Sequence, residues 1–291
     1  MAGDVVLGEA RVFRTGPAVL GESPFWDAGA LHWVDISRGL LQVSPGGAPA
    51  DGSADRVHEL PAPLPCIQPA EGGGYVAALK DRVVRLDADG LITAELAHVG
   101  LANDGMRLNE GKVDPQGALF VGAMDAEQAD AAWYRVDGSG AAVHLGGFAV
   151  TNGLEWSVDG STVYLADTAV QSIYRAPWDP DAGPGELTLL HSGDSADGAV
   201  LDADGCLWTA VHGDGVVLRL DPEGRELERV TVPVAAVTGI CFGGEDRSTL
   251  FVCSASEGMS DEERAAEPLS GAVFAVDTAV HGLPLRRFRA S

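Results

Sequence analysis

The chain has 291 residues, of which 46% are hydrophobic, so it is long enough to bury one large core or two ordinary ones. Its formal net charge of −24 repels phosphate backbones and anionic lipid, which argues against nucleic-acid binding and binding at a membrane surface. Residues 1–10 lack a secretory leader and no apolar run is long enough to span a bilayer, so we predict a cytoplasmic protein. The four cysteines show neither a C-x-x-C pair nor zinc-ligand spacing, and most lie in apolar runs, which predicts buried thiols.

Six similar units follow one another along the chain. Each begins with a turn signal and a short β-rich run, and the first residues of the six turns are Asp27, Ala70, Asp114, Ser157, Asp202 and Gly243. The steps between these positions are 43, 44, 43, 45 and 41 residues. Each unit also contains a second strand-like run, at Leu40–Val43, Val83–Leu86, Trp133–Val136, Ile173–Ala176, Val217–Leu220 and Val273–Val276. A repeat of this length with several short strands is typical of one propeller blade.

The predicted fold is therefore all-β: a six-bladed β-propeller with four-stranded antiparallel blades, formed by residues 1–291 as a single domain. A β-sandwich is the structural alternative, but six regular repeats favour radial closure. The units lack the apolar i, i+3, i+4 spacing of helical repeats, and the one helix candidate, Ser260–Ala266, is too short to define a fold. We expect Ala10–Thr15 to complete the last blade alongside Leu285–Arg289.

The repeat also predicts where a site lies. The residue five positions before each turn signal is Glu22, Pro65, Asn109, Asn152, Asp197 or Thr238 in the six successive units. Equivalent positions in a propeller are related by a pseudo-sixfold axis, so these side chains should point to the same end of the central channel. Asn-Gly and Asp-Gly pairs are also ordinary turn dipeptides, which is the alternative reading of each position taken alone.

The shared register favours a metal site. Two carboxylates and two amides that converge on one axis would repel or remain unsatisfied without a cation or strongly polar group between them. A divalent ion meets that need. Oxygen donors suit Ca²⁺, Mg²⁺ or Mn²⁺, with Zn²⁺ and Fe²⁺ as alternatives, and we expect Ca²⁺. No histidine occupies the register. His212 lies in a turn of the fifth unit and is a candidate for the pocket rim.

The same residues carry a family resemblance that runs nearly the whole chain. The segments Gly21-Glu22-Ser23-Pro24-Phe25-Trp26, Arg107-Leu108-Asn109-Glu110-Gly111, Thr151-Asn152-Gly153-Leu154-Glu155-Trp156 and Asp197-Gly198 resemble signature blocks of the gluconolactonase/regucalcin family, the senescence-marker-protein type. That family consists of six-bladed propellers that act as metal-dependent lactonases. The resemblance therefore implies the fold that the repeat predicts, and it adds an activity.

The resemblance also assigns roles to individual residues. It implies that Glu22, Asn152 and Asp197 are metal ligands and that Asp197 is the general base. It implies substrate contacts for Arg107, Asn109 and Glu127. Asn109 shares the register of the ligands, so it is also a candidate fourth ligand. Glu110 stands where the family usually has Asp, and this longer side chain could change the pocket wall and the substrate preference.

We therefore expect metal-dependent hydrolysis of a sugar-acid lactone, an aldonolactone, to the free sugar acid. The ion would polarise the carbonyl and activate water, and Asp197 would accept the proton of that water. Two alternatives stay open: an esterase or organophosphate hydrolase on the same scaffold, and a non-enzymatic calcium-binding regulatory protein. The expected partner is a small lactone, and the sequence indicates neither the particular sugar nor the oligomeric state.

Overall fold

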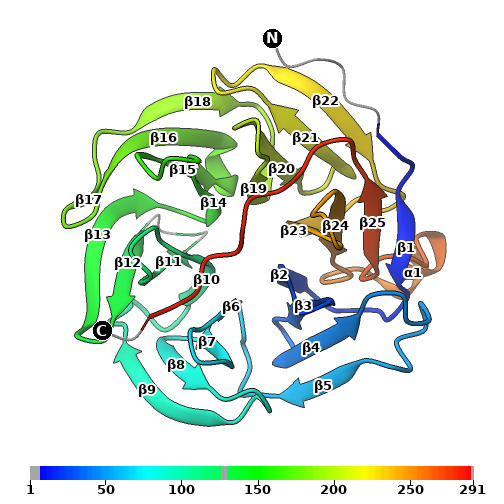
Figure 1. Ribbon diagram of the computed structural model, residues 1–291, viewed down its shortest axis with the longest axis horizontal. Coiled ribbons are helices and arrows are strands. Elements are labelled where there is room, and N and C mark those ends of the chain that lie inside the picture. The colour runs from blue at the N-terminus through cyan, green and yellow to red at the C-terminus, as the bar shows by residue number, and fades with distance from the viewer. Residues whose placement is uncertain (1–6, 126, 128–129, 290–291) are drawn as a thin grey trace.

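Six antiparallel sheets surround a central channel in the computed structural model, which describes residues 7–125, 127 and 130–289 (Figure 1). In Figure 1 the sheets follow one another around the ring in chain order. Blade one contains β2 (Gly21–Asp27), β3 (Ala30–Asp35), β4 (Leu40–Pro45) and β5 (Arg56–Glu59). Blade two contains β6 (Cys66–Pro69), β7 (Tyr75–Ala78), β8 (Arg82–Leu86) and β9 (Ile92–His98). Blade three contains β10 (Arg107–Val113), β11 (Leu119–Met124), β12 (Ala131–Asp137) and β13 (Gly140–Phe148).

The remaining blades repeat this order with one variation. Blade four contains β14 (Thr151–Trp156), β15 (Thr162–Asp167), β16 (Ser172–Asp179), β17 (Gly183–Pro184) and β18 (Thr188–Ser192), and both β17 and β18 pair with β16. Blade five contains β19 (Ala196–Leu201), β20 (Leu207–Val211), β21 (Val216–Leu220) and β22 (Glu226–Thr231). Blade six contains β23 (Val237–Gly243), β24 (Thr249–Ser254), β25 (Val273–Asp277) and β1 (Arg11–Arg14). The predicted six-bladed propeller is confirmed.

The turn signals of the sequence are the hairpins between the first and second strands of each blade. The turn at Asp202, for example, joins β19 to β20, and its buried carboxylate organises it. Asp202 Oδ1 accepts hydrogen bonds from the backbone N–H groups of Asp204 and Cys206, at 3.0 and 2.9 Å, and Oδ2 accepts from Trp208 Nε1 at 2.9 Å. Aspartate therefore supplies the partners that this tight turn leaves unpaired. The six second strand-like runs predicted from the sequence all fall in the third strands of the blades.

The ring closes through the N-terminal strand. β1 pairs antiparallel with β25, so the first strand of the chain completes the last blade, as expected for Ala10–Thr15. The expectation that Leu285–Arg289 lies beside it is wrong. In Figure 1 the segment that follows β25 crosses the channel instead of pairing at the blade edge. In this segment Gly282 forms an isolated β-bridge with Asp202, and Phe288 forms one with Ala70.

Ionic and apolar contacts hold this C-terminal segment, residues 278–289. Arg286 Nη1 lies 3.0 Å from Glu155 Oε1, and Arg287 Nη2 lies 2.7 Å from Asp27 Oδ1. Phe288 is 1% exposed and belongs to the main apolar cluster. The segment therefore connects blades that lie apart around the ring, which a sheet-edge strand could not do.

The helix candidate of the sequence is confirmed as α1 (Asp261–Ala266), which begins at a capping box formed by Ser260 and Glu263. Trp33, Trp156 and Trp208 are buried in the apolar core. The four cysteines are free and buried, as predicted. Among the described residues, no helix is long and apolar enough to cross a bilayer.

Candidate active site

Backbone irregularities mark the predicted site. The innermost strands of five blades shift register by a β-bulge at or next to the predicted position, between Glu22 and Phe25, Leu108 and Gly111, Asn152 and Glu155, Ala196 and Ala199, and Val237 and Ile240. Gly153, with φ +59°, lies inside the bulge of β14, where any Cβ would meet Ala166 at 2.6 Å. A bulge re-aims the side chain beside it and ends the regular pairing. The repeated bulges thus present one residue of each strand to the channel.

These residues line a cavity of about 180 Å³ at one end of the channel. Five of the six register positions contribute to its wall, and Thr238 instead donates a hydrogen bond of 2.6 Å to the carbonyl oxygen of Gly21. Strand residues and loops between strands complete the lining. The full set is Leu20, Glu22, Ile36, Pro65, Arg107, Asn109, Glu110, Met124, Val150, Asn152, Thr168, Asp197, His212 and Glu257.

A chain of hydrogen bonds orients the two amides of the site. Arg107 Nη1 donates to Asn109 Oδ1 at 2.5 Å, and Asn109 Nδ2 donates to Asn152 Oδ1 at 3.0 Å. Asn152 Nδ2 in turn donates to Thr168 Oγ1 at 2.8 Å, and that hydroxyl donates to the carbonyl oxygen of Ala196 at 2.6 Å. The amide nitrogen of Asn152 is thereby engaged on blade four, and its oxygen keeps a second lone pair for a ligand.

Glu22 and Asp197 are carboxylates crowded together at the centre of this cavity. Burial raises the pKa of Glu22 well above its usual value, and the neighbouring carboxylates Asp197 and Glu110 raise it further. Burial also raises the pKa of Asp197, against the opposing effect of His212, whose Nδ1 lies 3.7 Å from Asp197 Oδ2. Two carboxylates that lose water and face one another are less easily ionised, and a cation between them would stabilise their ionised forms.

Glu110 is a third carboxylate of the wall. Its Oε1 accepts a hydrogen bond of 2.8 Å from the N–H of Gly111. Burial raises the pKa of Glu110 to about 7, although Lys112 opposes the shift. The residue that departs from the family pattern is therefore part of the pocket wall.

The oxygen atoms of the site suit a divalent cation. The carboxylates of Glu22 and Asp197 and the amide oxygen of Asn152 are hard donors, of the kind that Ca²⁺, Mg²⁺ and Mn²⁺ prefer. One Glu22 oxygen, Oε2, already accepts from the N–H of Ser23 at 2.7 Å. Within the described part of the chain, no three His, Cys, Asp or Glu residues form a metal-holding cluster, so the donor set depends on this amide. The crowded acid pair fits a cation.

The structure brings together most of the predicted site residues. Glu22, Arg107, Asn109, Asn152 and Asp197 all line the cavity. Glu127 does not line it: this residue lies in an exposed turn beyond β11, where its backbone N–H donates to Asp125 Oδ1 at 3.4 Å. A substrate contact by Glu127 thus stays a prediction.

Several cavity residues carried no clear signal in the sequence. Thr168 and Glu257 lie in the loops that follow the second strands of blades four and six, β15 and β24, outside the predicted register. His212 comes from the equivalent loop of blade five and does line the cavity. The sequence makes His212 a candidate for the pocket rim, and a search for polar residues just after each second strand would have found Thr168 and Glu257 as well.

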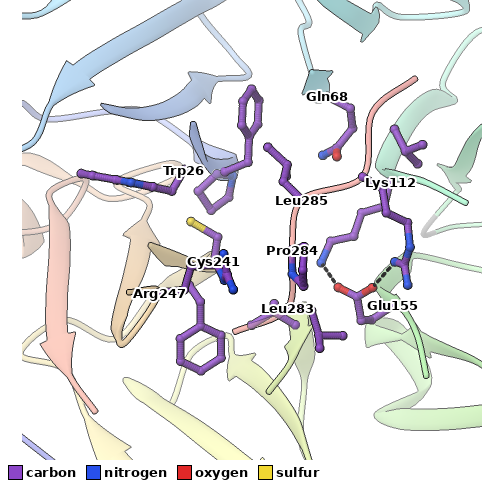
Figure 2. A pocket seen from close by; sticks show the side chains of 15 residues that line it. Trp26, Gln68, Lys112, Glu155, Cys241, Arg247, Leu283, Pro284 and Leu285 are labelled. Carbon is purple, nitrogen blue, oxygen red and sulfur yellow. Dashed lines mark hydrogen bonds and ion pairs between the residues drawn. The ribbon is translucent and has the colours of Figure 1, made fainter. Parts of the chain in front are cut away.

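A second cavity of about 90 Å³ lies three residues further along the innermost strands, closed by residues 283–286 (Figure 2). Figure 2 shows Lys112 and Glu155 facing one another beside this segment. Lys112 Nζ lies 3.0 Å from Glu155 Oε2, and Arg286 binds the other oxygen of the same carboxylate. These charges are already paired with one another, so the cavity has the character of a structural core and the chemistry belongs to the first cavity.

Comparison with known proteins agrees with the fold. The SMP-30/Gluconolactonase/LRE-like region matches residues 20–256. A 6-deoxy-6-sulfogluconolactonase of Pseudomonas putida is 38% identical over 276 residues, covering 91% of this chain and 94% of the relative. Regucalcin of Gallus gallus is 33% identical over 91% of this chain and 93% of its own. The crystal structure of a calcium-binding protein, regucalcin, from Agrobacterium tumefaciens superposes with a TM-score of 0.88 at 30% identity, covering 97% and 98% of the two chains.

The structure thus defines the class of protein: a six-bladed propeller with a polar, acid-rich cavity at one end of its channel. The chain belongs to the SMP-30/gluconolactonase/LRE-like family.

Proposed function

We propose that the protein hydrolyses a sugar-acid lactone to the free sugar acid, with a divalent ion held by Glu22, Asn152 and Asp197. The observation that carries the proposal is the pairing of two partly buried carboxylates, whose pKa values are both raised, beside an oriented amide oxygen in one cavity. The similarity to a 6-deoxy-6-sulfogluconolactonase supports a lactone substrate, and the similarity to a calcium-binding regucalcin supports Ca²⁺. Zn²⁺, Mg²⁺, Mn²⁺ and Fe²⁺ are alternatives for the same donors.

When bound, the ion would polarise the lactone carbonyl and lower the pKa of water. Asp197 would accept a proton from the attacking water as the new C–O bond forms. The ring C–O bond then breaks, and the departing ring oxygen takes the proton back from Asp197. The products are a carboxylic acid and an alcohol, so atoms and charge balance.

Arg107 and Asn109 bind the substrate in this proposal. Within the described residues, the Nε and Nη2 atoms of Arg107 form no hydrogen bond, which leaves them available to a lactone oxygen. Arg107 also holds Asn109, and Asn109 holds Asn152, so the substrate contacts and the ion ligand form one connected unit. Such a unit fixes the geometry of attack before the substrate arrives. Asn109 is in addition a candidate fourth ligand.

The test is hydrolysis of several aldonolactones in a pH-stat, with and without a chelator. We expect chelator-sensitive turnover that returns when a divalent ion is added, and a loss of about 100-fold or more in kcat for Asp197→Ala, the range typical of a general base. Turnover that survives complete chelation would refute metal dependence. Ca²⁺ binding without turnover of any lactone would favour the calcium-binding alternative, and turnover of aryl esters or organophosphates alone would favour the esterase alternative.

A further inference from the structure

The wall of the active-site cavity carries an excess of negative charge. Four carboxylates line it, those of Glu22, Glu110, Asp197 and Glu257, whereas Arg107 is the one guanidinium among the described lining residues. A divalent ion at Glu22 and Asp197 would compensate only part of this charge. A substrate that brings a further negative charge therefore meets repulsion from this wall.

Glu257 is the carboxylate of this set that the proposed chemistry does not use. It lies in the turn after β24, in blade six, and is exposed at the mouth of the cavity. Its position is held from the neighbouring blade, because the hydroxyl of Ser37 donates a hydrogen bond of 2.6 Å to Glu257 Oε1. The loop after β3 thus anchors Glu257, and its charge has a defined place.

Glu257 shares the cavity with Arg107, which enters it from blade three. Burial lowers the pKa of Arg107, and among the carboxylates that raise it Glu257 has the largest effect, ahead of Glu22 and Asp197. Arg107 is the natural partner for an anionic group of a substrate. A fixed carboxylate at the mouth offsets that attraction.

We propose that Glu257 is a specificity-determining residue, whose anchored carboxylate offsets Arg107 and makes the cavity select uncharged polyhydroxy lactones over lactones with a phosphate group. This inference rests on the proposed lactonase function. The alternative role for Glu257 is purely structural, as a clamp between blades six and one through Ser37. Glu257→Gln separates the two roles, because the amide oxygen keeps the Ser37 hydrogen bond while the charge is lost.

The experiment compares kcat/KM for D-glucono-δ-lactone and 6-phosphoglucono-δ-lactone, above the spontaneous rate, in the wild type, Glu257→Gln and Glu262→Gln. Glu262 is exposed in α1 and does not line the cavity, so its replacement is a control with the same change in net charge. We expect the wild type to favour the uncharged lactone. Glu257→Gln should narrow this preference by about fivefold at low salt, the effect of one charge at roughly 8 Å in a partly solvated site. The change should come mainly from a lower KM for the phosphorylated lactone, and it should diminish at high salt.

A ratio unchanged in Glu257→Gln, or changed equally in Glu262→Gln, would overturn the inference while leaving the lactonase function in place. A wild type that prefers the phosphorylated lactone would overturn it as well. If no lactone is hydrolysed, the proposed function fails. The effect of the Glu257 charge is then tested by measuring the binding of gluconate and 6-phosphogluconate by calorimetry. Glu257→Gln must then tighten binding of 6-phosphogluconate relative to gluconate, and equal binding changes for the two acids would refute the selectivity.

Discussion

Replacing Asp197 by asparagine removes a negative charge from the active site and leaves its shape nearly unchanged. Asp197 and Glu22 lie partly buried beside one another, and their desolvation together with their mutual repulsion raises the pKa of Glu22. Without a cation, the ionised pair therefore destabilises the folded protein at neutral pH. The variant removes one of the two charges and keeps nearly the same volume. We expect opposite effects on stability in the absence and in the presence of metal.

The sizes of both effects follow from the burial of the pair and the length of the chain. Relieving the repulsion between two like charges at close range is worth about 1–4 kcal/mol, between the screening of bulk water and that of a protein surface. For 291 residues the unfolding entropy makes each kcal/mol worth about 1.6 °C in Tm. The metal-free variant should thus melt about 2–6 °C higher than the metal-free wild type. Metal at about 100 times its Kd should raise the wild-type Tm by about 4–5 °C, since it contributes about 2.7 kcal/mol.

The assay is thermal unfolding at pH 7, followed by circular dichroism, in a chelator and then with Ca²⁺ or Zn²⁺ in excess. Asp204→Asn is a matched control, because Asp204 lies in the same blade with a side chain that is 65% exposed. The metal-dependent rise in Tm should disappear in Asp197→Asn and persist in the control. A metal-dependent rise of full size in Asp197→Asn, or a chelated variant less stable than the chelated wild type, would refute the reasoning.

Two further predictions concern groups outside the catalytic cavity. Burial lowers the pKa of His32 from 6.5 to about 4, so its contribution to stability is complete above pH 6.5 and is lost as the pH falls towards 4. Between pH 7 and pH 5 the wild type should lose about 2 kcal/mol more than His32→Phe in urea unfolding, and equal losses would contradict this. The pKa of Glu155 is lowered, because Lys112 and Arg286 outweigh the effect of burial, so its stabilising effect is present above pH 4.5 and is lost as the pH falls further. Glu155→Gln leaves Lys112 buried without its counter-charge and should cost about 3 kcal/mol at pH 7, and a cost below about 1 kcal/mol would show that the ion pair is not needed.

The sequence by itself determined the architecture and the centre of the site. Six turn signals at nearly equal spacing are local features, since Asp, Gly and Pro shape turns through their own backbone and side-chain bonds. Equal spacing then places Glu22, Asn109, Asn152 and Asp197 at equivalent points of the ring, and this convergence needs no knowledge of long-range contacts.

The tertiary structure alone decided what surrounds that centre. Glu257 and Thr168 reach the cavity from loops, where no repeat sets the register, and Glu127 lies in an exposed turn outside the cavity lining. The C-terminal segment crosses the channel because Arg286 forms an ion pair with Glu155 and Phe288 packs in the apolar core. Such contacts join residues more than 100 positions apart, and they depend on side-chain chemistry that becomes adjacent only when the ring has closed.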